Sequence, residues 1–246
     1  MIRFYRLIVL LFLYCCACSR TTVPDSTALR SDSLAVQIER TIAEKKRILA
    51  MKRELEGSRY SRAILSYRPI IRKYAKRHGF DWRLIAAQIM QESKFHESAR
   101  SPVGASGLMQ LMPETARALT REMDVEHILL NPRDNIAVGI YHLKKQYDFF
   151  PEADAVNRTQ LSLASYNCGA GRIFDAQSIA RYYQTSPYSW GTIREYITHL
   201  KSTDWELHLQ IWPLGRPRYG YFYGYKETIT YVDNVWDLYQ VFTRIL

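Results

Sequence analysis

Apolar residues at helical spacing after Asp81 constrain the fold of this chain more than any other stretch. Trp82, Ile85 and Ile89 recur at intervals of three and four, the period of an amphipathic α-helix. Asp81 is a favoured N-cap residue, so the helix is predicted to begin at Trp82. One further turn places Glu92 on the same face, about 20° from Ile85 around the helix axis. The sequence therefore predicts an inward-facing carboxyl group at the end of a helix.

Two physical effects would raise the pKa of Glu92. Partial burial disfavours the charged carboxylate, and the negative end of the helix dipole lies at the C-terminal turn. A glutamic acid that stays protonated near neutral pH can act as a general acid. The alternative is a glutamate at a frayed helix end, surrounded by solvent and without a catalytic role.

The residues that follow Glu92 favour the catalytic interpretation. A loop rich in small residues comes next, and small residues let an extended ligand approach the backbone closely. The loop contains Ser101, Pro102, Gly104, Ser106 and Gly107. Residues 108–112 then predict a short helix that stops or restarts at Pro113.

Three segments carry a family resemblance. Glu92-Ser93 together with residues 101–113, SPVGASGLMQLMP, resembles the catalytic motif of the soluble-lytic-transglycosylase (SLT) domain of glycoside hydrolase family 23. Residues 164–172, ASYNCGAGR, and 227–232, ETITYV, resemble two later motifs of that family in the same order. The similarity covers roughly residues 64–246, and within it YGYFYGY is similar to the catalytic module of the membrane-bound lytic murein transglycosylase F group.

The resemblance implies an all-α, lysozyme-like fold with at most a minor hairpin. It also implies a lyase that cleaves peptidoglycan between N-acetylmuramic acid and N-acetylglucosamine and leaves a 1,6-anhydromuramic end. Glu92 would act first as general acid and then as base, with no metal and no other cofactor. The motif positions imply substrate contacts by Ser93, Ser101, Gln110, Met112, Tyr166, Asn167, Glu227 and Tyr231.

The resemblance supplies only Glu92 as an obvious catalytic carboxylate. Ordinary glycosidases use two carboxyl groups about 5 to 9.5 Å apart. Asp81 is expected to cap a helix, while Glu97 and Glu114 are expected to face solvent. Glu227 is either a polar group of the site or a charge that stabilises the start of its helix. A single acid suits the transglycosylase reaction, because the 2-acetamido oxygen of the sugar can trap the cationic centre.

Two other functions stay open at this point. One is a muramidase that uses water, as goose-type lysozymes of similar fold do. The other is a non-catalytic protein that binds peptidoglycan strands.

The N-terminal residues 1–18 have the pattern of an export signal. A basic start is followed by an apolar run that is too short to span a membrane, and Ala17 precedes Cys18. This resembles a bacterial lipoprotein signal, which implies lipidation of Cys18 and a periplasm-facing anchor in the outer membrane. Cys16 is a competing site, and an ordinary signal peptide is the alternative.

The rest of the chain divides into two predicted parts. Residues 19–59 read as a polar tether followed by an amphipathic helix over 33–56. Residues 60–246 form the predicted SLT-type domain. Its helices are expected to run up to Gly79, from Trp82, around 116–119, and over 135–147, 159–167 and 227–246. Residues 173–225 are rich in aromatic residues, most of which are expected to pack in the core.

Charge and cysteine usage exclude several classes of protein. The net charge is +10, and +8 without Arg3 and Arg6, which suits an anionic polymer or a membrane surface. Motifs for nucleic-acid binding are absent from the sequence, so no nucleic-acid partner is expected.

Of four cysteines, Cys168 alone lies in the domain, which excludes an internal disulfide framework. Cys168 stands where the family has alanine and is expected to pack, so activity should survive Cys168→Ala.

Overall fold

The computed structural model describes residues 38–39, 41–47, 49–50, 52–53, 59–123 and 131–246. The predicted signal, Cys18 and the predicted tether lie outside the described residues. The described residues between 38 and 53 are helical, in agreement with the predicted amphipathic helix. The domain predicted over 60–246 falls within a compact unit, Arg47–Leu246.

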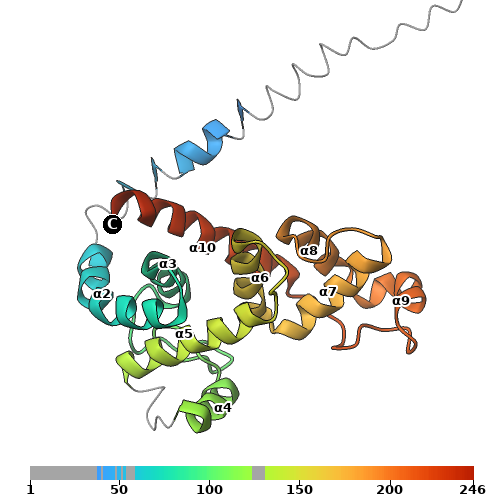
Figure 1. Cartoon of the computed structure of the whole chain (residues 1–246), viewed down its shortest axis with the longest axis horizontal. Coiled ribbons are helices and arrows are strands. Elements are labelled where there is room, and N and C mark those ends of the chain that lie inside the picture. Colours follow the sequence, from blue (N-terminus) through green and yellow to red (C-terminus); the bar gives the residue numbers. More distant parts are fainter. Residues whose placement is uncertain (1–37, 40, 48, 51, 54–58, 124–130) are drawn as a thin grey trace, which may run out of the picture. The chain divides into compact units, whose positions relative to one another are not determined.

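The regular elements in the described part of the compact unit are helices joined by loops (Figure 1). Two isolated bridges, Arg100 with Ser106 and Ser106 with Leu111, are the extended pairings recorded among the described residues. The all-α prediction is confirmed. The elements are α2 (Arg59–His78), α3 (Trp82–Ser93), α4 (Pro113–Met123), α5 (Pro132–Asp148), α6 (Ala155–Cys168), α7 (Ala170–Tyr182), α8 (Trp190–Tyr196), η1 (Ile197–His199), η2 (Ser202–Asp204), α9 (Trp205–Ile211) and α10 (Tyr225–Ile245).

Helix α3 begins and ends as the sequence predicted. The side chain of Asp81 accepts a hydrogen bond from the backbone N–H of Arg83 at 2.9 Å, which satisfies one free donor of the first turn. Lys94 adopts a left-handed conformation with φ 51° and ends the helix after Ser93. Most of α3 between these limits is buried, so it is a core helix and not a surface one.

The long C-terminal helix α10 packs against both α3 and α6. Its buried apolar residues Val232, Val235 and Phe242 join Ile85 and Ile89 of α3 in one core. Burial of such side chains is worth about 1.5–3 kcal/mol each. The packing of α10 therefore fixes the helix that carries Glu92.

The prediction of a short helix over 108–112 is wrong. Gln110 has φ 44°, which a right-handed helix does not allow, and the backbone groups of Leu111 bond to those of Ser106 at 3.0 and 3.1 Å. The segment closes the loop, and α4 begins at Pro113 because proline is favoured in a first turn.

The expectation that most aromatic residues of 173–225 pack in the core holds for about half of them. Of the thirteen, Trp190 and Trp212 are buried, and Phe174, Tyr196, Phe222 and Tyr225 are partly buried against the core. Six are exposed, namely Tyr182, Tyr183, Trp205, Tyr219, Tyr221 and Tyr223. The same region contains α7, α8 and α9, which were not predicted as separate helices.

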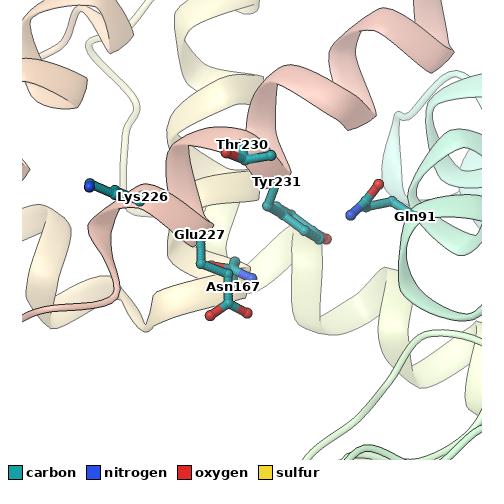
Figure 2. Close-up of a pocket in the computed structure, with 6 residues that line it drawn as sticks. All are labelled: Gln91, Asn167, Lys226, Glu227, Thr230 and Tyr231. Carbon is teal, nitrogen blue, oxygen red and sulfur yellow. The ribbon is translucent and has the colours of Figure 1, made fainter.

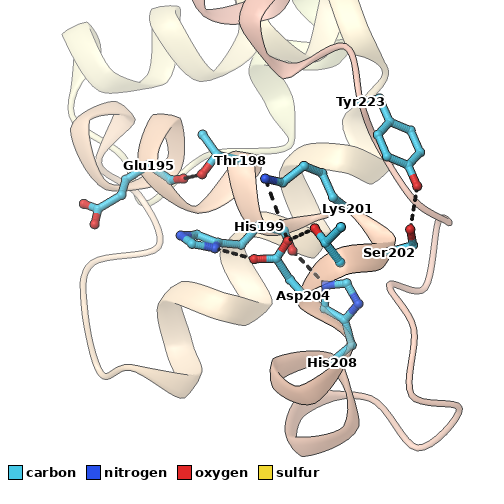
Figure 3. A network of polar contacts seen from close by, with 9 residues as sticks. Glu195, Thr198, His199, Lys201, Ser202, Asp204, His208 and Tyr223 are labelled. Carbon is cyan, nitrogen blue, oxygen red and sulfur yellow. Dashed lines mark hydrogen bonds and ion pairs between the residues drawn. The ribbon is translucent and has the colours of Figure 1, made fainter.

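A polar network holds the segment that leads into α10 (Figure 3). His199 Nδ1 lies 2.8 Å from Asp204, and His208 Nε2 donates to the carbonyl of His199 at 2.7 Å. The hydroxyl of Tyr223 donates to Ser202 at 2.8 Å. The first two bonds lie within residues 199–208, and the third ties that segment to Tyr223, two residues before α10 begins.

None of the helices in the described ranges has both the length and the apolar character needed to cross a bilayer.

Candidate active site

Glu92 lies in the last turn of α3, and its side chain is only partly exposed. Burial raises its pKa from an ordinary value of 4.5 to about 8, as predicted in direction. The hydroxyl of Tyr231 donates to Glu92 Oε1 at 2.6 Å and acts in the opposite direction, because it stabilises the carboxylate. The interpretation of Glu92 as a frayed, solvated residue is therefore excluded. At neutral pH this side chain is a protonated acid.

Tyr231 is itself positioned by a residue that the sequence did not suggest. Gln88, fully buried one turn before Glu92, donates from Nε2 to the Tyr231 hydroxyl at 3.2 Å. The hydroxyl thus receives one hydrogen bond from α3 and returns one to the same helix. Gln88 Oε1 has no partner among the described residues. A polar residue four positions before Glu92 in an apolar stripe was the available signal.

Tyr166, at the end of α6, faces the same region. Its hydroxyl donates to the backbone carbonyl of Met109 at 2.7 Å, which links α6 to the small-residue loop. Burial raises the pKa of Tyr166 well above its usual value, and the charge of Glu92 raises it further. The ring of His142 lies 4.9 Å from that of Tyr166, and burial lowers the pKa of His142 to about 4. Both side chains are therefore neutral near pH 7.

A pocket of about 290 Å³ opens beside Tyr231 (Figure 2). Its lining comes from α3, α6 and α10, and Figure 2 shows the tyrosine ring directed toward the α3 side. Thr228 donates to the Asn167 side chain at 2.8 Å and holds it at the pocket. The lining residues are Gln91, Asn167, Lys226, Glu227, Thr230 and Tyr231. Gln91, Lys226 and Thr230 were not predicted.

The small-residue loop over 99–111 is held by side chains that the family motif had assigned to substrate. Ser101 Oγ accepts from the backbone N–H of Ala105 at 3.0 Å. Gln110 Nε2 donates to the carbonyls of Ala99 and Gly107 at 3.1 and 2.9 Å. Both side chains therefore shape the loop.

The side chain of Asn135 in α5 holds this loop by two hydrogen bonds. This residue was not predicted from the sequence. Its side chain accepts from the N–H of Met109 at 2.8 Å and donates to the carbonyl of Ser106 at 3.1 Å. It is buried, so both bonds form away from water. The loop is thereby placed in register with α5.

The remaining predicted residues differ in their access to a ligand. The hydroxyl of Ser93 is buried and donates to the carbonyl of Ile89 within its own helix at 3.2 Å. Met112 is exposed, and so are the predicted solvent-facing residues Glu97 and Glu114. Burial raises the pKa of Cys168 to about 12, so its thiol stays neutral and unreactive.

No group of three or more His, Cys, Asp or Glu side chains in the described part of the chain is arranged to hold a metal ion.

Comparison with known proteins places this geometry in a family. The family model described as the transglycosylase SLT domain matches residues 69–188. Residues 69–188 form an SLT domain. Glu92 and Tyr166 lie inside the matched range, whereas Tyr231 reaches the site from beyond it.

Longer similarities extend past the SLT domain. The chain is 35% identical over 178 residues to membrane-bound lytic murein transglycosylase F of Desulfosudis oleivorans, covering 71% of this chain and 36% of the relative. It is 32% identical over 185 residues to the protein of that name from Marinobacter nauticus, covering 73% of this chain and 33% of the relative. The chain thus spans about a third of the length of these relatives.

A solved structure supports the fold. The complex of the 70-kDa soluble lytic transglycosylase with bulgecin A is similar, with a TM-score of 0.50 and 26% identity. The similarity covers 75% of this chain and 25% of that one. The predicted lysozyme-like architecture is confirmed.

Proposed function

We propose that this chain is a peptidoglycan lytic transglycosylase with Glu92 as its acid and base. The observation that carries the proposal is a glutamic acid of pKa about 8 in an SLT domain. It is hydrogen-bonded to Tyr231, which lines a pocket formed by polar side chains. The names of the relatives, murein transglycosylases, support the same substrate.

The reaction needs one acid that works twice. Protonated Glu92 gives its proton to the glycosidic oxygen, and the bond from that oxygen to C1 of N-acetylmuramic acid breaks. The 2-acetamido oxygen of the sugar stabilises the cationic C1. The resulting Glu92 carboxylate then takes the proton of the 6-hydroxyl, whose oxygen bonds to C1. The product is a 1,6-anhydro ring, no water is consumed, and Glu92 ends protonated.

Other residues are proposed to bind and orient the sugar. Asn167 and Glu227 lie at the pocket and can accept or donate hydrogen bonds to hydroxyl and acetamido groups. Tyr231 is proposed to orient the carboxyl group of Glu92 through its hydrogen bond to Oε1. Ser101, Gln110 and Met112 are proposed to present the loop to the strand, the first two through the backbone that they hold. Ser93 is proposed to act through its helix alone, since its hydroxyl is turned inward.

The decisive experiment is digestion of purified sacculi by the wild type and by Glu92→Gln. We expect the wild type to release products about 18 Da lighter than hydrolysis would give, the difference being one water. Removal of a general acid costs about 10²- to 10⁴-fold in rate, so Glu92→Gln should be inactive on this scale. Glu114→Gln, an exposed carboxylate at the start of α4, is the control. Hydrolytic ends would indicate a muramidase, and binding without release would indicate a non-catalytic protein.

We further propose that the chain is a cell-envelope lipoprotein lipidated at Cys18. The basic start, the short apolar run and the residue before Cys18 support this, as does the term membrane-bound in the names of the relatives. Mass spectrometry of the mature N-terminal peptide tests it. An unmodified N-terminus downstream of Cys18 would contradict it, and a lipid on Cys16 would move the site.

A further inference from the structure

A second recess of about 410 Å³ lies away from the residues of the catalytic pocket. It is lined by residues just after α5, by α7, by Tyr188 and by residues of the segment 212–219, and it shares no lining residue with the pocket beside Tyr231. We call it the arginine recess and define it by Phe149, Glu152, Phe174, Arg181, Arg218 and Tyr219. None of these residues has a role in the mechanism above.

The floor of the arginine recess is rigid. Asp175 of α7 is 1% exposed, and its two oxygens accept from the backbone N–H groups of Arg218 and Tyr219 at 3.0 and 2.9 Å. The guanidinium of Arg172 donates to the carbonyls of Tyr219 and Gly220. The backbone over 218–220 is thus held from two sides. The side chains of Arg218 and Tyr219 are exposed, and the Arg218 guanidinium lies 5.8 Å from the centre of the Tyr219 ring.

The rim exposes large aromatic rings. Phe149 is 48% exposed and Tyr219 is 46% exposed, although both contact Phe174 with ring centroids 5.4 and 6.1 Å apart. Half-exposed aromatic rings grouped around a recess are typical of ligand contact and not of core packing.

The charges at the rim suit a ligand that carries carboxylates. Arg181 and Arg218 are exposed, and neither forms an ion pair within 4.0 Å in the described ranges. The charge of Arg218 nonetheless acts on the buried carboxyl group of Asp175, because burial raises the pKa of that group and the charge of Arg218 acts to lower it. Arginine binds carboxylates through paired hydrogen bonds. The exposed carboxylate of Glu152 adds an acceptor for an amine. Two arginines, one glutamate and flat apolar rings together match a short peptide with free carboxylates and an amine.

We propose that the arginine recess binds the stem peptide of the peptidoglycan strand that is cleaved at Glu92. This inference rests on the proposed function and extends it from the sugar to the peptide. The stem peptides of peptidoglycan carry free carboxylates and, where their diamino acid is not cross-linked, an amine.

The two sites are close enough to share one strand. Tyr219 of the recess and Lys226 of the catalytic pocket are seven positions apart in the chain, so their Cα atoms are separated by at most about 25 Å. An extended peptide of five residues spans about 17 Å, and the sugars of the strand add to that reach.

The test measures binding, so it does not depend on turnover. The full chain carrying Glu92→Gln is titrated by calorimetry with soluble glycan strands that keep their stem peptides, and with the same strands stripped by an N-acetylmuramoyl-L-alanine amidase. Adding Arg181→Gln and Arg218→Gln should weaken binding of the stem-bearing strands at least about tenfold, as expected for lost charge-assisted hydrogen bonds. Binding of the stripped strands should not change.

Arg216→Gln is the matched control, because Arg216 is exposed in the same segment and does not line the recess. It should leave both affinities unchanged. An equal loss on stem-bearing and stripped strands would show that the recess binds sugar, and no loss on either would show that it binds neither; both results overturn the inference. Failure of the wild type to release anhydro products would instead refute the proposed function.

Discussion

The Tyr231 hydroxyl has a defined direction because both of its neighbours are fixed. Gln88 Nε2 can only donate, so the hydroxyl accepts from it and must give its own proton to Glu92 Oε1. The acidic proton of Glu92 is therefore left on Oε2. The two hydrogen bonds, from Gln88 to Tyr231 and from Tyr231 to Glu92, thus determine which oxygen of the carboxyl group can serve as the acid.

Replacing Tyr231 by phenylalanine should shift the alkaline limb of the pH profile. Activity of the wild type should fall as pH rises through about 8, because the acid form of Glu92 is lost there. The bond from Tyr231 lowers the pKa of Glu92, so in Tyr231→Phe this pKa should rise by about one to two units. Activity at neutral pH should fall at the same time, because the carboxyl group is no longer oriented. The measurement is the pH dependence of kcat.

Gln88→Met provides a graded comparison for that experiment. It keeps the volume of the side chain and leaves the Tyr231 hydroxyl in place, but removes the donor. The alkaline limb should move in the same direction by a smaller amount. A limb that stays at the wild-type pH in both variants would show that the tyrosine does not control the acid.

Glu92 could be predicted from the sequence, and the family motifs also named Tyr231, whereas the contact between Tyr231 and Gln88 could not be predicted. Periodicity within one helix sufficed to turn Glu92 inward, because that signal is local. Gln88 and Tyr231 are 143 positions apart, and their contact depends on how α10 crosses α3. No local pattern encodes such a crossing.

At the scale of elements, the loop over 99–111 depends on one close approach. Gly107 has φ +82°, and a Cβ built on it would lie 2.3 to 2.9 Å from side-chain atoms of Asn135. Asn135 is the residue that bonds to Ser106 and Met109. A larger residue at 107 must therefore displace the anchor of the loop.

Gly107→Ala should destabilise the protein and reduce activity. The strained backbone costs about 1–3 kcal/mol, and displacement of Asn135 adds to that cost. Thermal unfolding and sacculus digestion measure the two effects. Gly79→Ala is the control, because Gly79 has φ +77° but nothing within 4 Å of the added Cβ. Equal losses of activity in the two variants would contradict the anchoring role.

The elements that sequence reasoning placed correctly have local signals. Asp81 predicted the start of α3 because a cap depends on its immediate neighbours. The segment over 108–112 has a helical composition, but Gln110 adopts a left-handed conformation to satisfy the loop. Helix α7 had no distinct polar face, since Asp175 and Gln177 are buried beside its apolar residues. In both cases tertiary contacts override local preference.

At the scale of the whole molecule, the raised pKa of Glu92 links stability to pH. Between the unfolded value of 4.5 and the folded value of about 8, the folded state holds a proton that the unfolded state has lost. Stability therefore decreases as pH rises across this window. Glu92→Gln lacks this dependence, because its amide does not titrate.

The melting temperature of Glu92→Gln relative to the wild type should accordingly increase with pH. The difference should be small at pH 5 and should grow by roughly 5 °C or more by pH 8. Calorimetric scans of both proteins across this range provide the measurement. A constant difference would mean that Glu92 is not buried as an acid in the folded protein.

The bond between Glu92 and Tyr231 joins residues 139 positions apart, and the second comes from the last helix of the chain. A ribosome thus synthesises the acid long before it synthesises the groups that enclose it. A copy that stops before α10 lacks Tyr231 and the part of the enclosure of Glu92 that α10 supplies. Under the proposed mechanism, a copy therefore becomes competent only after α10 has been synthesised and has packed against α3.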